Sequence, residues 1–196
     1  MDTMMLEENA NKLVSPGRGI LAADESTGTM SSRLQGVGVD PSEEARRSYR
    51  ANLFATPGCE AAVSGVILFD ETIRQMMDDG TPIPDYMVAQ DILPGIKVDT
   101  GAHPLANHDG EKITEGLDGL RTRCIEYFNM GARFAKWRAV ITIADDIPSQ
   151  ACISANAHAV ARCSAICQEQ GLVPFIEPVV LMNVNHDALR DYSVTA

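Results

Sequence analysis

The feature that most constrains this sequence is a regular alternation of short apolar segments with helical segments. Five segments rich in apolar and β-branched residues are predicted to be strands, at 19–24, 63–69, 92–99, 131–143 and 172–181. The segments 4–13, 41–55, 115–129 and 148–170 are predicted to be helices. Strands that alternate with helices form parallel βαβ units, and strands that are apolar on both faces suit a sheet covered by helices. The chain is therefore predicted to be an α/β protein.

Polar residues lie at or near the carboxyl ends of these strands. They are Asp24, Lys97, Asp99, Lys136, Arg138 and Glu177. A (β/α)₈ barrel builds its active site at this edge of its sheet, and a complete barrel needs about 250 residues. No Gly-x-Gly-x-x-Gly turn or Gly-x-x-x-x-Gly-Lys loop is present, which argues against a nucleotide-binding domain. The prediction is an incomplete (β/α)₈ barrel, strands 1 to 5 with their helices, in a single domain over residues 1–196.

Some connections carry turn residues. Residues 80–84 are predicted to form a turn and residues 101–110 a loop. The dipeptide Pro94-Gly95 is expected to interrupt the third strand. Ser26 and Thr29, just after the first strand, can bind phosphate through hydroxyl and backbone groups, but they also suit an ordinary loop.

The segment 131–140 carries three cations, and two of them, Lys136 and Arg138, lie inside its apolar run. Because side chains alternate along a strand, Lys136 and Arg138 share one face with Phe134, whereas Trp137 lies on the other. A buried Lys and Arg are costly unless they meet anions. Two interpretations follow: a structural ion-pair network, or a site for an anionic substrate with a lysine prepared for amine chemistry.

Composition and residue spacing argue against several other classes of protein. Apolar residues make up 45% of the chain and its formal net charge is −11, which suits a soluble protein and argues against nucleic-acid binding. No run of about 18 apolar residues and no signal peptide is present, so no membrane association is expected. Five cysteines without Cys-x-x-Cys spacing predict free thiols in a cytoplasmic compartment, with Cys163 and Cys167 buried. The four histidines lack ligand spacing, so no metal is predicted.

The charged residues indicate a type of reaction. Asp24 and Glu177 are carboxylates available for general acid–base catalysis. Lys97, Lys136 and Arg138 can hold a phosphate or stabilise an anionic transition state. A desolvated lysine beside other cations can attack a carbonyl to form a Schiff base. Together they indicate a carbonyl phosphate substrate and carbon–carbon bond chemistry.

Each residue also has a structural interpretation. Asp24 can cap the turn that follows the first strand. Glu177 can pair with Arg138, and Lys97 can pair with Asp99.

Six segments together resemble the class I fructose-bisphosphate aldolases, Schiff-base lyases built on a (β/α)₈ barrel. In chain order they are GILAADESTG (19–28), GVILFDE (65–71), GIKVD (95–99), GLDGL (116–120), FAKWR (134–138) and VPFIEP (173–178). The resemblance implies an enzyme of glycolysis and gluconeogenesis. It would cleave fructose 1,6-bisphosphate reversibly to dihydroxyacetone phosphate and glyceraldehyde 3-phosphate, without a metal or other cofactor.

The same resemblance implies roles for matching positions. Asp24 is expected to be the base for the C4 hydroxyl, Lys136 the cation beside the reacting carbon, and Glu177 the acid/base that helps to expel water as the Schiff base forms. The expected substrate contacts are Ser26, Lys97 and Arg138, with Arg33 near a phosphate. Sugar phosphates are the expected partners, and a homotetramer is the expected assembly.

The sequence departs from the family pattern at its carboxyl end. The family's Schiff-base lysine lies on the sixth strand, which this sequence does not reach. Val179 replaces the second acid of the family's Glu-Pro-Glu, on the face that carries Glu177, and residues 181–187 replace a turn richer in Gly and Asp. Two alternatives stay open: a non-catalytic fragment that retains phosphate binding, and a Schiff-base enzyme that uses Lys136, as transaldolase-like barrels use a lysine on the fourth strand.

Overall fold

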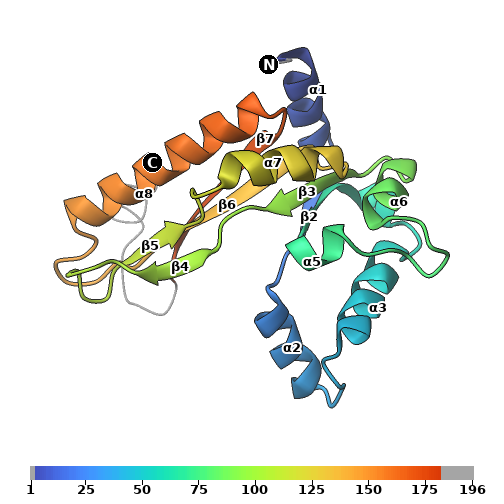
Figure 1. The fold of residues 1–196 in the computed structure, drawn as a ribbon, viewed down its shortest axis with the longest axis horizontal. Coiled ribbons are helices and arrows are strands. Elements are labelled where there is room, and N and C mark those ends of the chain that lie inside the picture. The colour runs from blue at the N-terminus through green and yellow to red at the C-terminus, as the bar shows by residue number, and fades with distance from the viewer. Residues whose placement is uncertain (1–2, 182–196) are drawn as a thin grey trace.

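The computed structural model describes residues 3–181, and its centre is a curled sheet of five parallel strands (Figure 1). The strands are β1 (Gly19–Ala23), β2 (Val63–Leu68), β3 (Leu93–Lys97), β6 (Phe134–Ile141) and β7 (Val173–Val180). They lie in the order β1-β2-β3-β6-β7, and neighbouring strands pair in parallel. The five predicted strands are confirmed.

The expected interruption of β3 is wrong. The strand runs through Pro94 and Gly95 without a break. A proline lacks only the donor N–H, and the Pro94 carbonyl still accepts a hydrogen bond of 2.8 Å from the Arg133 N–H. The backbone therefore keeps its sheet geometry at this dipeptide.

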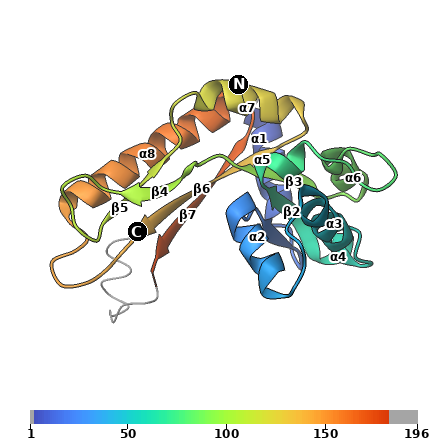
Figure 2. The same cartoon turned by 60° about the horizontal axis from the view of Figure 1, so that its bottom comes forward.

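Eight helices accompany the sheet in residues 3–181. They are α1 (Thr3–Leu13), α2 (Thr27–Gly36), α3 (Glu43–Phe54), α4 (Cys59–Ala62), α5 (Asp70–Ile73), α6 (Ile83–Ala89), α7 (Leu120–Asn129) and α8 (Gln150–Glu169). Helices α7 and α8 lie side by side along one face of the sheet, and α1 lies beside the beginning of β7 (Figures 1 and 2). This placement leaves the carboxyl ends of the strands clear of α1.

The larger core fills the space between the sheet and these helices. Alternate strand residues supply it, among them Leu68, Ile96, Ala135 and Trp137, each at most 1% exposed. Trp137 therefore lies on the helix-covered face of β6, and the predicted alternation of this strand is confirmed. Burial of such side chains is the main source of stability in a sheet of this kind.

A second, smaller core closes the amino half of the inner face. It contains Leu13, Ile67, Leu93 and Phe134. The Phe134 ring lies against Gly95, where a Cβ atom would overlap the ring. The inner face is thus filled at its amino end, and the polar residues are gathered at its carboxyl end.

Several elements differ from the sequence expectation. The segment expected to be a loop contributes β4 (Gly101–Pro104), which pairs antiparallel with β5 (Lys112–Glu115). The helix expected from residue 115 consequently begins at Leu120. Helix α2 forms where a loop was expected, and α6 takes in the last two residues of the expected turn, Ile83 and Pro84. The hairpin is fixed to the sheet because the Thr114 hydroxyl donates to the Arg138 carbonyl at 2.7 Å.

Residues 3–181 include no helix that has both the length and the apolar character to cross a membrane. Apart from Leu181, the segment 181–187 lies outside the described residues.

Candidate active site

A cavity of about 1090 Å³ opens at the carboxyl ends of the strands. Six of the seven predicted site residues line it: Asp24, Ser26, Arg33, Lys97, Lys136 and Arg138. The seventh, Glu177, is not among the lining residues, but its carboxylate contacts Lys136. The structure therefore brings the seven residues together, while their roles stay predictions.

Lys136 lies between two carboxylates. Its Nζ donates to Asp24 Oδ2 at 3.1 Å and lies 3.0 Å from Glu177 Oε2. The Lys136 side chain is 7% exposed and that of Asp24 is 11% exposed. Charges at this depth persist only when opposite charges compensate them. The cation from β6 is thus held between an acid that follows the first strand and an acid on the last.

Glu177 faces both cations of β6. It lies opposite Arg138 in the β6–β7 ladder, and Arg138 Nε is 3.9 Å from Glu177 Oε2. The predicted pair of Glu177 and Arg138 is present, but Lys136 is the closer partner. The Arg138 side chain is 45% exposed, so it presents much of its guanidinium to the cavity.

Asp99 connects the end of β3 with the middle of β6. One of its oxygens accepts from Lys97 Nζ at 2.6 Å and from the Gly101 N–H at 3.1 Å. The other accepts from the Arg138 N–H at 3.2 Å. The predicted Lys97–Asp99 pair is confirmed. This buried carboxylate fixes both the Lys97 ammonium and the backbone that carries Arg138.

The connection after β1 is a helix cap and not a loop. The Ser26 hydroxyl accepts from the Thr29 N–H at 3.3 Å, which satisfies a free donor at the start of α2. The interpretation of Asp24 as a turn cap is wrong, because Ser26 fills that position and Asp24 pairs with Lys136. Arg33 lies further along α2, where its guanidinium pairs with the Glu25 carboxylate.

The cavity wall also contains charged and polar residues that the strand pattern did not single out. They are Glu25, Asp70, Arg74, Arg123, Glu126 and Tyr127. Asp70 accepts from Arg74 at 2.8 Å and from the Tyr127 hydroxyl at 2.9 Å. The bond from Arg74, with that from Tyr127, holds the pKa of Asp70 below its usual range although partial burial acts against it. The sequence does offer one signal for Asp70, which is its position: Asp70 comes just after β2, as Asp24 comes just after β1.

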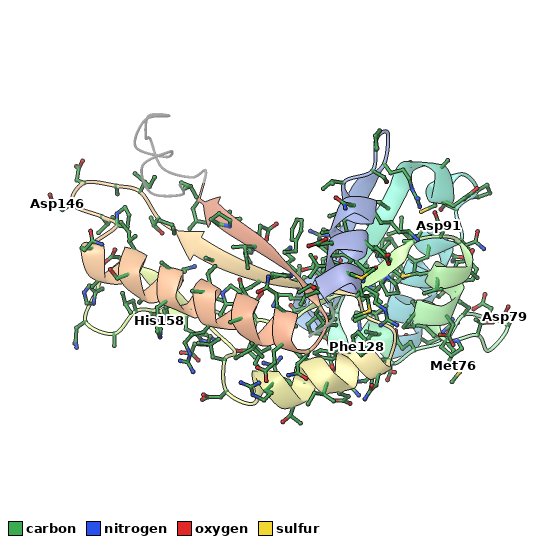
Figure 3. All side chains as sticks on the ribbon, turned by 90° about the horizontal axis from the view of Figure 1, so that it is seen from above. Met76, Asp79, Asp91, Phe128, Asp146 and His158 are labelled. Carbon is green, nitrogen blue, oxygen red and sulfur yellow. The ribbon has the colours of Figure 1, made fainter. Side chains whose placement is uncertain are left out.

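The described residues show no metal centre. Between residues 3 and 181, no three His, Cys, Asp or Glu side chains are grouped so that they could hold a metal ion. His103 is exposed, and His158 is exposed on α8 (Figure 3). Cys163 and Cys167 are free and buried, as predicted. The charged groups that line the cavity are carboxylates, ammonium groups and guanidinium groups.

This set of groups suits an anionic ligand that undergoes proton transfer. Lys97 and Arg138 are cations that can contact phosphate oxygens. Asp24 and Glu177 are carboxylates that share one ammonium group, so protons can be exchanged over short distances.

Comparisons with known proteins agree with this geometry. A family model described as fructose-bisphosphate aldolase class-I matches residues 5–196. The probable fructose-bisphosphate aldolase class 1 of Xanthomonas campestris pv. campestris is 57% identical over 195 residues. The cytosolic fructose-bisphosphate aldolase 6 of Arabidopsis thaliana is 51% identical over 187 residues. A crystal structure of fructose-bisphosphate aldolase from Plasmodium falciparum, in complex with TRAP and a small-molecule inhibitor, aligns with a TM-score of 0.94 at 43% identity.

These alignments cover almost all of this chain and a little over half of each relative. The alignment with the Xanthomonas protein covers 100% of this chain and 58% of that relative. The corresponding shares are 95% and 52% for the Arabidopsis protein, and 97% and 57% for the Plasmodium structure. The curled sheet with its helices matches an incomplete (β/α)₈ barrel, as predicted.

Proposed function

This chain belongs to the class-I fructose-bisphosphate aldolase family, and we propose that it provides acid–base and substrate-binding groups for aldol cleavage of fructose 1,6-bisphosphate. The products would be dihydroxyacetone phosphate and glyceraldehyde 3-phosphate, in a reversible reaction that proceeds through a Schiff base. The observation that carries the proposal is the position of Lys136 between Asp24 and Glu177, beside the cavity.

The acid–base roles follow from this arrangement. Asp24 removes the proton from the C4 hydroxyl as the carbon–carbon bond breaks, and the Lys136 ammonium stabilises the charge that develops beside it. Glu177 helps to expel water as the Schiff base forms. Its oxygen lies 3.0 Å from Lys136 Nζ, so both groups can act on the same leaving oxygen.

The phosphate groups of the substrate are proposed to bind along the cationic side of the cavity. Arg138 is the strongest candidate because its guanidinium is exposed there. Lys97 is held in place by Asp99, which reduces the conformational entropy lost when it binds an anion. Ser26 and Arg33, at the two ends of the same short helix segment, are the further contacts.

Lys136 is not the proposed nucleophile. The alternative that uses Lys136 requires a lysine whose nearest charged neighbours are cations, whereas its nearest partners are Asp24 and Glu177. The Schiff base is therefore assigned to another amine.

The test is an aldol-cleavage assay of the purified protein, with and without sodium borohydride, followed by intact mass and peptide mapping. Cleavage that is lost in Asp24→Asn, with no borohydride adduct on Lys136, supports the proposal. Arg121→Met is the matched control, since Arg121 pairs with Glu169 away from the cavity. An adduct on Lys136 would overturn the assignment of roles. Binding of the bisphosphate without turnover would favour the alternative of a non-catalytic, phosphate-binding chain.

We also propose a single domain, a cytoplasmic location and a homotetramer. One continuous sheet supports the first proposal, and five free cysteines support the second. The Arabidopsis relative is named as cytosolic. The tetramer rests on family resemblance alone, and light scattering after size-exclusion chromatography tests it through the mass of the particle.

A further inference from the structure

A fully buried arginine lies next to the segment that follows β1. Arg50 of α3 has 0% exposure and does not line the cavity. Its Nη2 donates to the Glu25 carbonyl at 2.6 Å, and its Nη1 donates to the Thr72 hydroxyl at 2.7 Å. A guanidinium group is costly to bury, so a residue at this position must gain compensating contacts.

Two glutamates supply the opposite charge. The Glu25 carboxylate lies 3.7 Å from Arg50 Nη2, and the Glu71 carboxylate lies 4.0 Å from Arg50 Nη1. Each glutamate directly follows an aspartate that lines the cavity, Asp24 in one case and Asp70 in the other. Because β1 and β2 are paired neighbours, both Asp-Glu dipeptides lie at adjacent strand ends. Arg50 therefore holds the two glutamates while the two aspartates face the cavity.

We infer that Arg50 is a positioning residue for Asp24. Its bond to the Glu25 carbonyl fixes the peptide group between Glu25 and Ser26, one residue beyond Asp24, and so restrains the backbone from which the Asp24 carboxylate extends. The result is the 3.1 Å contact between Asp24 and Lys136. The inference rests on the proposed role of Asp24 and extends it to a residue outside the cavity wall.

Arg46 is the natural comparison. It lies one helical turn before Arg50 on α3, its side chain is 10% exposed, and it forms two bonds to Glu71 at 2.8 and 2.7 Å. Its other bonds go to the Pro41 carbonyl and to the Ser31 hydroxyl, and it makes no bond to residues 24–26. Arg46 thus shares the burial, the helix and one acidic partner of Arg50, but not the contact with the Asp24 segment.

The first experiment is a double-mutant cycle on ligand affinity. Arg50→Lys and Arg46→Lys are each made in the native chain and in Asp24→Asn, and the dissociation constant for fructose 1,6-bisphosphate is measured by calorimetry. We expect Arg50→Lys to weaken binding about tenfold in the native background and by less than about twofold in Asp24→Asn. Arg46→Lys is expected to leave the dissociation constant within about twofold in both. Equal losses in the two backgrounds, or equal losses for the two arginines, would show that Arg50 acts through packing alone.

A second measurement needs no ligand. Hydrogen–deuterium exchange is followed in the peptide that covers residues 24–30, at denaturant concentrations that match the stabilities of the variants. Arg50→Lys is expected to speed this exchange several-fold over Arg46→Lys, because the Glu25 carbonyl loses the guanidinium that now donates to it. If the native chain binds no bisphosphate, the proposed function fails. The exchange rates of Arg50→Lys and Arg46→Lys still decide whether Arg50 positions the segment that carries Asp24. Unchanged exchange would overturn the inference.

Thr72 offers a milder change should Arg50→Lys fail to fold. Thr72→Val keeps the shape of this buried side chain and removes the hydroxyl that Arg50 holds, whereas Thr72→Ser retains the hydroxyl. Faster exchange of residues 24–30 in Thr72→Val than in Thr72→Ser is the expected result. Equal exchange in this pair would count against the inference.

Discussion

Lys136 and Asp24 form an ion pair of 3.1 Å although 112 positions separate them in the sequence. Lys136 lies on β6 and Asp24 directly follows β1, and these two strands are separated in the sheet by β2 and β3. The pair therefore spans the inside of the curl and does not join neighbouring strands. It links the curvature of the sheet to the chemistry of the cavity, because the two groups meet only when the strands bend toward one another.

Replacement of Lys136 by methionine tests this link. The change leaves the carboxylates of Asp24 and Glu177 close together without a cation, and we expect the free energy of unfolding at pH 7 to fall by about 3 kcal/mol. Urea unfolding at pH 7 measures the loss. A loss below about 0.5 kcal/mol, the size of an ordinary surface substitution, would show that the ion pair contributes little to the fold.

Arg138 is expected to behave differently from Lys136. Its side chain is half exposed and its acidic partner is distant, so Arg138→Met should change the free energy of unfolding by less than about 0.5 kcal/mol. If Arg138 contacts a phosphate, the same change should weaken bisphosphate binding by about tenfold, which corresponds to about 1.4 kcal/mol. Calorimetric titration of the variant beside Arg121→Met gives the comparison. Equal affinities of the two variants would remove Arg138 from the binding site.

Much of the fold was predictable because β-strand and helix patterns are local. The apolar strands, the polar residues at their carboxyl ends and the alternation of Lys136 with Trp137 all follow from side-chain periodicity. The Lys97–Asp99 pair was also predictable, since residues two positions apart in an extended segment share a face. The meeting of Lys136 with Glu177 and Asp24 depended on the barrel topology, which the βαβ pattern indicated.

The remaining elements depend on contacts that sequence patterns do not encode. The α2 segment contains glycine, serine and threonine residues of low helix propensity, and it gains the cap from Ser26. The β4–β5 hairpin depends on distant pairing, such as the bond from Thr114 to the Arg138 carbonyl. Arg50 lies in a strongly polar helix, where an arginine is normally exposed, and only the fold reveals that it is buried.

The close contact between Gly95 and Phe134 gives a stability prediction. A methyl group at residue 95 overlaps the Phe134 ring, which is fully buried and has no space to move away. Gly95→Ala should therefore lower the free energy of unfolding by about 3 kcal/mol, and Phe134→Leu should recover part of the loss in the double variant. Gly28→Ala is the control, because a Cβ at this helical position meets nothing within 4 Å. Thermal unfolding compares the variants, and equal midpoints for the two alanine variants would contradict the packing argument.

Glu111 gives a prediction for acid pH. Burial alone would raise the pKa of this carboxyl, but hydrogen bonds from the backbone and hydroxyl of Ser149 and from the Cys152 thiol outweigh burial and hold the pKa below its usual value. A lowered pKa means that Glu111 stabilises the fold above the unfolded value of about 4.3, and that this contribution is lost as the pH falls through the lower folded value. Glu111→Gln should therefore cost about 2 kcal/mol at pH 7 and progressively less below pH 4.

The matched control for Glu111 is Glu7→Gln, which changes an exposed acid on α1. Urea unfolding at several values between pH 3 and pH 7 separates the two variants. Because Glu111 accepts the Ser149 N–H at the beginning of α8, loss of this bond should loosen the first turn of the helix before the sheet unfolds. Faster amide exchange in residues 150–153 of Glu111→Gln at pH 7 would show this loosening of the first turn. A parallel loss of stability in Glu111→Gln and Glu7→Gln at every pH would instead assign the effect to overall charge.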